Sequence, residues 1–113
     1  MFHTIATPES ITILWRGDSA IERGVASADD IGDRWWISRV LVQPATCRGR
    51  GVGSKLIEQL KAAVANQGGT RLVVAPGGYV GTAKERKRQK KFYEQHDFVE
   101  EEPGLFAWYP PPT

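Results

Sequence analysis

The stretch that decides the fold is RWWISRVLVQPATCRGRGVGSKLI, residues 34–57. Residues 34–42 are apolar on both faces of an extended chain and stop before Pro44, which predicts a central strand covered on both sides. From Gly51 to Val64 apolar residues recur at helical spacing, and Gly68 and Gly69 end that helix. The predicted strand and helix are therefore joined by a glycine-rich loop.

The elements predicted on either side complete one sheet. Strands are expected at 11–15 and roughly 20–28, with turns at 17–19 and 29–33, and at 71–75 after the helix. A strand–helix–strand crossover implies parallel pairing. A flexible loop at 77–81, a polar helix over roughly 83–96 and a hairpin between Phe98 and Tyr109 follow. The expected fold class is α/β (α+β), with a mixed, mostly antiparallel sheet, one βαβ unit, a second helix and a C-terminal β-hairpin.

Composition limits the class of protein. The 113 residues are 41% hydrophobic and 25% charged, which predicts a single domain over 1–113 with residues 110–113 as an exposed proline-rich tail. No apolar run approaches 18 residues and no signal peptide is visible, so no membrane span and a cytoplasmic location are expected. One cysteine excludes an internal disulfide. With two histidines it cannot form a usual zinc site, so no metal is expected.

Positive charge is concentrated in one short segment. Residues 84–91 hold six basic residues and one acidic residue, whereas the other 105 residues hold nine basic and twelve acidic ones, a net charge of −3. A general nucleic-acid binder would spread its charge more widely. The segment is therefore interpreted as a solvated helix face, with nucleic-acid contact as the weaker alternative.

The loop at 48–55 is a predicted anion site. Free backbone N–H groups and the positive end of the helix dipole meet at the start of a helix, and glycines let a phosphate approach that backbone closely. Arg48, Arg50 and Lys55 add formal positive charge. The glycine spacing fits neither a Walker A loop nor a Rossmann fingerprint. A phosphate-bearing ligand is therefore predicted, but not its identity.

Two sequence motifs resemble those of a known family and thereby indicate which ligand is expected. Arg48, Gly51 and Gly53 match Arg/Gln-x-x-Gly-x-Gly/Ala, and some forty residues later KFYEQHDF, residues 91–98, is similar to FYExxGF. In this order, with a long strand before the first motif and a hairpin after the second, they resemble the GNAT acetyltransferase superfamily over roughly residues 35–109. The resemblance implies a GNAT-like fold and acetyl-CoA as cosubstrate.

The resemblance also implies roles for particular residues. Tyr93 would protonate the departing thiolate, and backbone groups near Leu41 and Val42 would hold the pantetheine arm. The pyrophosphate cradle would consist of Arg48, Gly49, Arg50, Gly51, Val52, Gly53 and Ser54. The implied reaction is direct transfer of an acetyl group to a primary amine, and residues 84–91 could contact the 3′-phosphate of CoA. A catalytically silent module that binds CoA or a protein partner is the alternative function.

Departures from the family pattern shape further expectations. Asp97 replaces the glycine of FYExxGF, and Arg39 lies where many members place a carboxylate base, so no base is carried over. Glu22, Asp29 and Asp30 are possible bases that would act through water, and nothing in the sequence selects among them. The stretch before Arg48 is one residue longer than usual, which predicts a bulge at the strand end. Only 47 residues precede the first motif, so the helical pair that usually walls the acceptor site is expected to be reduced or absent. An open site would suit an amine on a peptide or protein.

Several residues also have purely structural interpretations. Tyr93 could be a core aromatic, and Cys47 is expected to be an inert packing residue rather than an acyl carrier. His96 is expected at a helix C-terminus, where it would interact with the dipole. Trp35 and Trp36 face opposite sides of one strand, so one is expected in the core and the other in the acceptor cleft or a homodimer interface.

Overall fold

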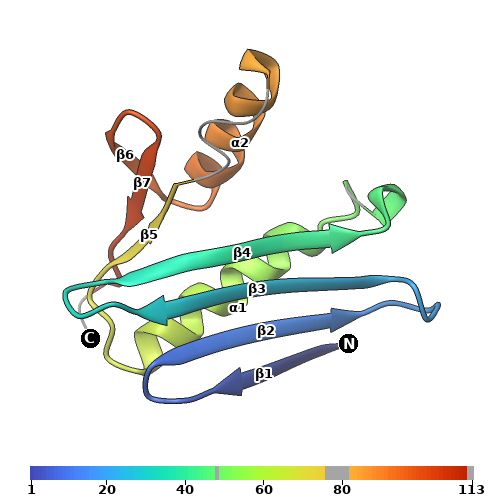
Figure 1. Cartoon of the computed structure of the whole chain (residues 1–113), viewed down its shortest axis with the longest axis horizontal. Helices are drawn as coiled ribbons and strands as arrows, with labels where there is room; N and C mark the ends of the chain where they lie inside the picture. Colours follow the sequence, from blue (N-terminus) through green and yellow to red (C-terminus); the bar gives the residue numbers. More distant parts are fainter. Residues whose placement is uncertain (48, 76–81, 112–113) are drawn as a thin grey trace.

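The computed structural model describes residues 1–47, 49–75 and 82–111, and one seven-stranded sheet runs through them (Figure 1). The predicted loop at 77–81 and Arg48 lie outside the described residues. The strand order is β1-β2-β3-β4-β5-β7-β6, and among these strands β4 and β5 pair in parallel while the other neighbours are antiparallel. The strands are β1 (Phe2–Ala6), β2 (Ser10–Arg16), β3 (Arg23–Asp30), β4 (Trp35–Gln43), β5 (Leu72–Val74), β6 (Val99–Glu102) and β7 (Leu105–Trp108). The expected fold class is confirmed.

The N-terminal strands differ from the prediction in two places. The edge strand β1 was not predicted, because it is short and mostly exposed, and pairing with β2 is what makes it a strand. The turn after β2 is longer than expected, since the backbone N–H of Gly17 bonds to the carbonyl of Glu22. Asp29 and Asp30 belong to β3 rather than to a turn, because β4 pairs with both of them.

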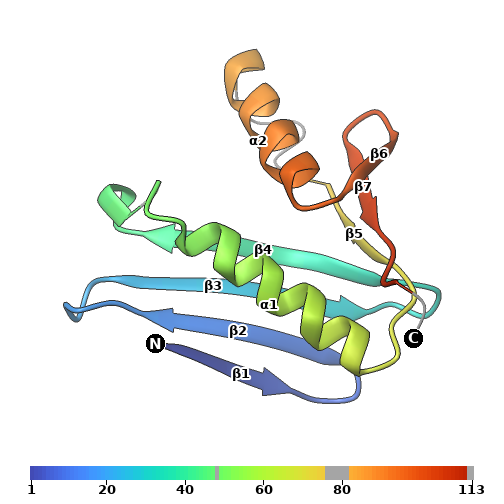
Figure 2. The same cartoon turned by 180° about the vertical axis from the view of Figure 1, so that it is seen from behind.

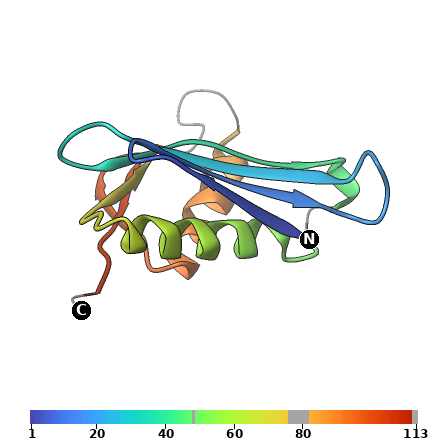
Figure 3. The same ribbon diagram turned by 90° about the horizontal axis from the view of Figure 1, so that it is seen from below.

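Helix α1 (Val52–Asn66) covers one face of strands β2–β4 (Figures 2 and 3). Its apolar stripe packs on alternate residues of β2 and β3, including Ile11, Ile13, Ala26 and Ala28, all fully buried. A Cβ at Gly24 would lie 3.0 Å from the Leu56 side chain, a tight contact that glycine avoids. The helix therefore lies close to the sheet.

A β-bulge divides strand β4. Ser27 pairs with Arg39 and Ala28 with Ile37, so Ser38 is the extra residue of β4. The bulge lies in the middle of the strand, whereas the sequence placed it at the end, where the short 3-10 helix η1 (Ala45–Cys47) follows. Beyond the bulge the alternation of side chains is shifted by one residue. Val40 and Val42 consequently face the α1 side, and Arg39 and Leu41 face the opposite side.

Strands β4 and β5 start side by side and then diverge (Figure 1). They pair only at Trp35–Leu72 and Trp36–Val73. Helix α2 (Ala83–Gln95) lies on the β5–β7 side, where the Tyr93 ring packs against Phe98 and Phe106. The molecule therefore opens between β4 and the C-terminal half.

The sheet face opposite α1 carries no described helix (Figure 3). Residues 1–47, all of which the structure describes, form four strands, their turns and η1. The helical pair expected to be reduced is thus absent from this part of the chain. Trp35 is in the core and Trp36 is half-buried on the open face, as their opposite orientations predicted. No helix among the described residues has both the length and the apolar character needed to cross a membrane.

Candidate active site

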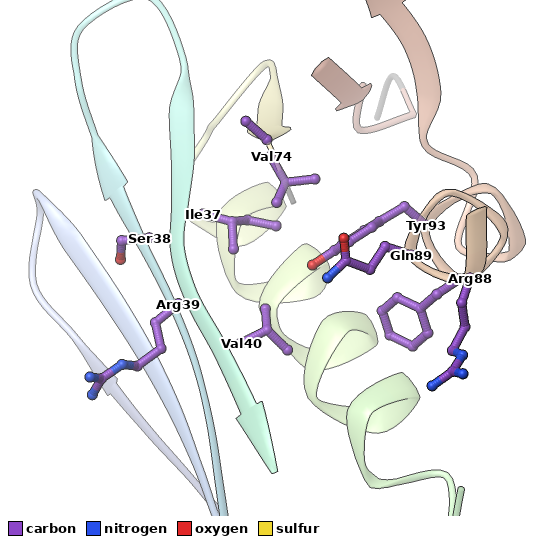
Figure 4. Close-up of a pocket in the computed structure, with 10 residues that line it drawn as sticks. Ile37, Ser38, Arg39, Val40, Val74, Arg88, Gln89 and Tyr93 are labelled. Atoms are coloured by element: carbon purple, nitrogen blue, oxygen red, sulfur yellow. The ribbon is translucent and has the colours of Figure 1, made fainter. Parts of the chain in front are cut away.

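A cleft of about 410 Å³ opens where β4 and β5 diverge (Figure 4). The β4 bulge forms one wall, Val74 and Ala75 the end, and helix α2 the other wall. The lining residues are Ile37, Ser38, Arg39, Val40, Val74, Ala75, Arg88, Gln89, Phe92 and Tyr93. The cleft lies where β4 and β5 separate, after the two paired positions Trp35–Leu72 and Trp36–Val73.

Tyr93 lies at the inner wall of this cleft, and its hydroxyl points from α2 toward β4 (Figure 4). The side chain is 6% exposed, and burial raises its pKa to about 12. The ring packs edge-on against Phe92 and Phe98. Tyr93 is thus both a core aromatic and a neutral hydroxyl group at the cleft, and the two interpretations of this residue do not compete.

A second hollow of about 380 Å³ lies at the glycine loop. Its lining residues are Val42, Gly49, Gly51, Gly53, Ser54 and Phe92. Phe92 borders both hollows, so they are neighbours, and together they are called the track from the start of α1 to the Tyr93 cleft. The structure brings the two sequence motifs together along this track: the glycine loop borders one hollow, Tyr93 borders the other, and Phe92 borders both.

The start of α1 has the properties of an anion site. Gly51 is the N-cap with φ +81°, and no side chain caps the helix there. Gly49 has φ +85°. A Cβ on either glycine would meet nothing within 4 Å, so glycine is required for the left-handed backbone conformation and not for space. The first-turn N–H groups lack a side-chain cap and can hold a phosphate.

The charged residues of the loop differ in their contacts and exposure. The guanidinium of Arg50 donates to Glu22 Oε1 at 3.1 Å and to Cys47 Sγ at 3.5 Å. The bond from Arg50 holds the pKa of the Glu22 carboxyl below its usual value, so this carboxylate stays charged beside Arg50. Lys55 is exposed on the first turn of α1. Cys47 is 1% exposed, in agreement with its interpretation as a packing residue.

A hydrogen-bonded network that the sequence did not predict positions Ser54. His96 Nε2 lies 3.0 Å from Ser54 Oγ, and His96 Nδ1 lies 2.6 Å from Glu58 Oε2. Burial raises the pKa of Glu58, but bonds from His96 and Lys61 outweigh it and the pKa is lowered. The Glu58 carboxylate can only accept, so His96 Nδ1 donates to it, and Nε2 forms the contact with the Ser54 hydroxyl.

This network changes what Ser54 can contribute to the predicted cradle. The Ser54 hydroxyl is already in contact with the His96 ring, whereas the backbone N–H groups at the start of α1 have no side-chain cap and are the donors available to a phosphate. His96 does lie at the C-cap of α2, as predicted, but its ring binds side chains of α1. Residues 42 positions apart make this contact, and no local signal in the sequence indicates it.

The remaining predicted site residues lie near the track but differ in orientation. Val42 is buried and lines the glycine-loop hollow, whereas Leu41 lies on the open sheet face. Val52 is buried in the core on α1, and Gly53 and Ser54 border the hollow. Arg48 lies outside the described residues. No group of three His, Cys, Asp or Glu side chains within the described ranges could hold a metal ion.

The cleft lacks an evident general base. None of its described lining residues is a carboxylate or an imidazole. None of the three candidates that the sequence left open lines the cleft: Glu22 is bonded to Arg50, and Asp29 and Asp30 lie at the end of β3. The basic residues of α2 are exposed, with Arg88 at the cleft and Lys90 paired with Glu100 at 3.2 Å. A solvated helix face is therefore confirmed for most of that segment.

Comparison with known proteins gives one consistent family. A family model for an acetyltransferase (GNAT) domain matches residues 8–100. Among solved structures, a GNAT family acetyltransferase from Elizabethkingia anophelis with acetyl-CoA bound is 15% identical, with a TM-score of 0.69 over 90% of this chain and 77% of its own. The aminoglycoside 6′-N-acetyltransferase from Enterococcus faecium is 18% identical, with a TM-score of 0.65 over 95% and 77%.

A protein that is matched over nearly its whole length also shares the fold. The anti-CRISPR protein AcrVA5 is 19% identical, with a TM-score of 0.62 over 86% of this chain and 97% of its own. Comparison with curated protein sequences gives no match. At these identities the solved structures are similar in fold, and the family model is what relates the sequence to a family.

Proposed function

Because the chain belongs to the GNAT acetyltransferase family, we propose that it transfers an acetyl group from acetyl-CoA to a primary amine. The resemblance of the two sequence motifs to this family is confirmed. The observation that carries the proposal is the track that runs from the uncapped start of α1, past Phe92, to the Tyr93 hydroxyl. We also infer that residues 1–113 form a single acetyltransferase domain, since β1–β7 share one sheet.

The residues along the track fit acetyl-CoA, which supplies a thioester-activated acetyl group. Backbone N–H groups at the start of α1, beside Gly51 and Gly53, would hold the pyrophosphate. Backbone groups of β4 near Leu41 and Val42 would hold the pantetheine arm. The Elizabethkingia structure, which has acetyl-CoA bound, supports this ligand for the shared fold.

The β4 bulge and Tyr93 would perform the chemistry. Backbone N–H groups near Ser38, released from the ladder by the bulge, would polarise the thioester carbonyl. The Tyr93 hydroxyl would donate to the departing sulfur. A free amine forms the new C–N bond as the C–S bond breaks, and the proton that the amine releases balances the one that the thiolate takes up.

The raised pKa of Tyr93 restricts how it acts. Complete transfer from a phenol with a pKa of about 12 to a thiolate with a thiol pKa of roughly 8.5 is uphill by about 5 kcal/mol. Tyr93 would therefore stabilise the leaving sulfur mainly as a hydrogen-bond donor. At neutral pH its hydroxyl stays fully protonated and available for this role.

The acceptor site we propose is open and suited to an amine on a peptide or protein. The sheet face opposite α1 carries no described helix, so a chain segment could lie across it beside the cleft. The lack of a carboxylate or imidazole in the described lining suggests that the amine loses its proton to water at this open side. A protein amine would reach the thioester without needing to be enclosed.

Thermal unfolding with acetyl-CoA, and with NAD and ATP as controls, tests the coenzyme. Acetyl-CoA at about 100 times its Kd should add roughly 2.7 kcal/mol of stability. For a domain of this size that raises Tm by on the order of ten degrees. An equal shift with all three ligands, or none with any, would contradict the cradle assignment.

Acetyl transfer to amines tests the reaction, with Tyr93→Phe as the variant. Loss of a catalytic proton donor should lower kcat by about 100-fold or more, while the thermal shift with acetyl-CoA is retained. Tyr109→Phe is the matched control, because Tyr109 bonds to Glu101 on the exposed hairpin and should keep full activity. Full activity in Tyr93→Phe would remove Tyr93 from the mechanism.

A catalytically silent module that binds CoA is the second candidate. Two observations favour this candidate. The described lining of the cleft contains no carboxylate or imidazole, and the raised pKa makes the Tyr93 hydroxyl a weak acid. This candidate predicts the thermal shift with acetyl-CoA but no release of free thiol in the presence of any amine. The two functions are thus separated by one assay of thiol release.

A further inference from the structure

The open sheet face beside the cleft carries a groove of about 450 Å³ that the proposed reaction does not yet use. Its described lining residues are Leu14, Trp15, Arg16, Arg23, Gly24, Val25, Arg39, Leu41 and Gln43. Arg39 lines both this groove and the Tyr93 cleft, and its side chain extends from β4 away from Tyr93 (Figure 4). The groove therefore begins at the mouth of the cleft.

Strand register arranges the outward side chains of β2, β3 and β4 in three rows. The middle row is apolar, with Leu14 opposite Val25 and Val25 opposite Leu41. One flanking row is Arg16, Arg23 and Gln43, and the other is Thr12, Ser27 and Arg39. An apolar floor thus has guanidinium groups at both ends.

The positive charge of the groove is not neutralised within the described structure. Arg16 and Arg23 face each other directly across β2 and β3, a like-charge pair that weakens a sheet. Neither they nor Arg39 form an ion pair with any residue in the described ranges. Glu22, the nearest carboxylate along the chain to Arg23, is bonded to Arg50. These charges are available to an anion supplied from outside.

We propose that this groove binds an acidic peptide segment of the protein that carries the acceptor amine, a proposal that rests on the acetyltransferase function above. The amine would lie in the cleft beside Arg39, with acidic side chains at Arg16 and Arg23. The two charged rows are four residues apart along β4, roughly 14 Å. An extended peptide covers roughly 13 Å in four residues, so the acidic residues lie about four positions from the acetylated lysine.

The groove floor favours a peptide over a nucleic acid. Leu14, Val25 and Leu41 offer aliphatic contact for side-chain stems, and no aromatic ring among the outward-facing groove residues provides a stacking platform for bases. Arginine binds carboxylates with two parallel hydrogen bonds, which gives such a site both affinity and orientation. Charge and shape together therefore select an acidic peptide.

The test is direct binding of fluorescent peptides, measured by anisotropy with saturating CoA. Each peptide has one acceptor lysine and, four residues after it or four residues before it, two glutamates, two glutamines or two further lysines. The glutamate peptide in one of the two orientations should bind about tenfold or more tightly than its glutamine counterpart. Equal binding of the glutamate and glutamine peptides in both orientations would overturn the proposal.

Two arginine variants assign the preference to the groove. Arg16→Gln with Arg23→Gln should abolish the glutamate preference, whereas Arg34→Gln, which removes an arginine paired with Asp33 in the turn before β4, should preserve it. If the double variant keeps the preference, the groove is not the site. Circular dichroism of each variant establishes that the fold is retained.

Two further results separate this proposal from the proposed function. Selective binding of the glutamate peptide without acetylation supports the peptide groove and contradicts the proposed acetyltransferase activity. Acetylation without any preference among the peptides supports the acetyltransferase activity and contradicts the peptide groove. A single-stranded oligonucleotide is included as competitor. If it binds more tightly than the glutamate peptide and depends on the same two arginines, the groove is a nucleic-acid site and the peptide proposal is wrong.

Discussion

At the scale of single residues, Asp97 stands where the family motif has glycine, and its backbone conformation is one that favours glycine. Its φ is +69°, the left-handed conformation that glycine adopts at low cost. The N–H of Phe98 bonds to the carbonyl of Tyr93, and that of Asp97 to the carbonyl of Glu94, which is a Schellman motif. Asp97 therefore occupies the C′ position where the family pattern has glycine, and it keeps the same backbone conformation.

Asp97→Gly is expected to stabilise the protein by about 0.5–1 kcal/mol. The substitution relieves the left-handed conformation. It also removes a 3.6 Å ion pair between the exposed Asp97 carboxylate and Lys61, but the Lys61 ammonium keeps its shorter bonds to Glu58 and to the His96 carbonyl. The free energy of unfolding in urea is the measurement, and Asp97→Ala is the control, expected to be no more stable than the parent. A less stable glycine variant would show that the ion pair outweighs the backbone strain.

At the scale of elements, Lys61 joins α1 to the end of α2. Its side chain is 5% exposed, and its ammonium donates to the His96 carbonyl at 2.9 Å and to Glu58 Oε2 at 3.1 Å. It also lies over the Trp108 ring, 4.9 Å from the centroid. A buried lysine thus satisfies a carbonyl at the C-terminus of α2, and it helps to hold the helix that carries Tyr93.

Lys61→Met is expected to cost about 1–3 kcal/mol of stability, because the apolar stem remains while the His96 carbonyl loses its buried donor. Urea unfolding measures the change. Lys87→Met, on the exposed face of α2, is the matched control and should lie within about 0.5 kcal/mol of the parent. Equal effects in the two variants would mean that the Lys61 bonds are not what connects the helices.

At the scale of the whole molecule, Tyr93 lies between two diverging halves. The α1-covered strands β1–β4 form one half, and β5–β7 with α2 form the other (Figure 1). Tyr93 packs with Phe98 and Phe106 of the second half while its hydroxyl points toward β4. Charging this buried phenol would therefore disturb the contact between the halves.

The pKa of Tyr93 predicts a loss of stability at alkaline pH. Below pH 10 the phenol is protonated in both folded and unfolded chains, so it makes no difference. Between pH 10 and about 12 only the unfolded phenol ionises, which lowers the free energy of unfolding by up to about 2.7 kcal/mol. The measurement is the difference between the parent and Tyr93→Phe over this range. A constant difference would contradict the burial-raised pKa.

Local patterns predicted much of this fold. The periodicity from Gly51 to Val64 predicted α1, and the βαβ order predicted the single parallel pairing, because both depend on neighbouring residues and on chain connectivity. The edge strand β1 and the extension of β3 to Asp30 were missed. Each becomes a strand only by pairing with another strand, and a short exposed segment carries no hydrophobic signal of its own.

The sequence by itself determined the family, the glycine loop and the position of Tyr93, because these lie in short contiguous motifs with strict spacing. The tertiary structure alone decided where the bulge at Ser38 opens the cleft, how His96 reaches Ser54, and which arginines share the open face. These features depend on strand register and on contacts between distant segments. A one-residue shift in pairing reverses the face that a side chain occupies, and no local pattern records such a shift.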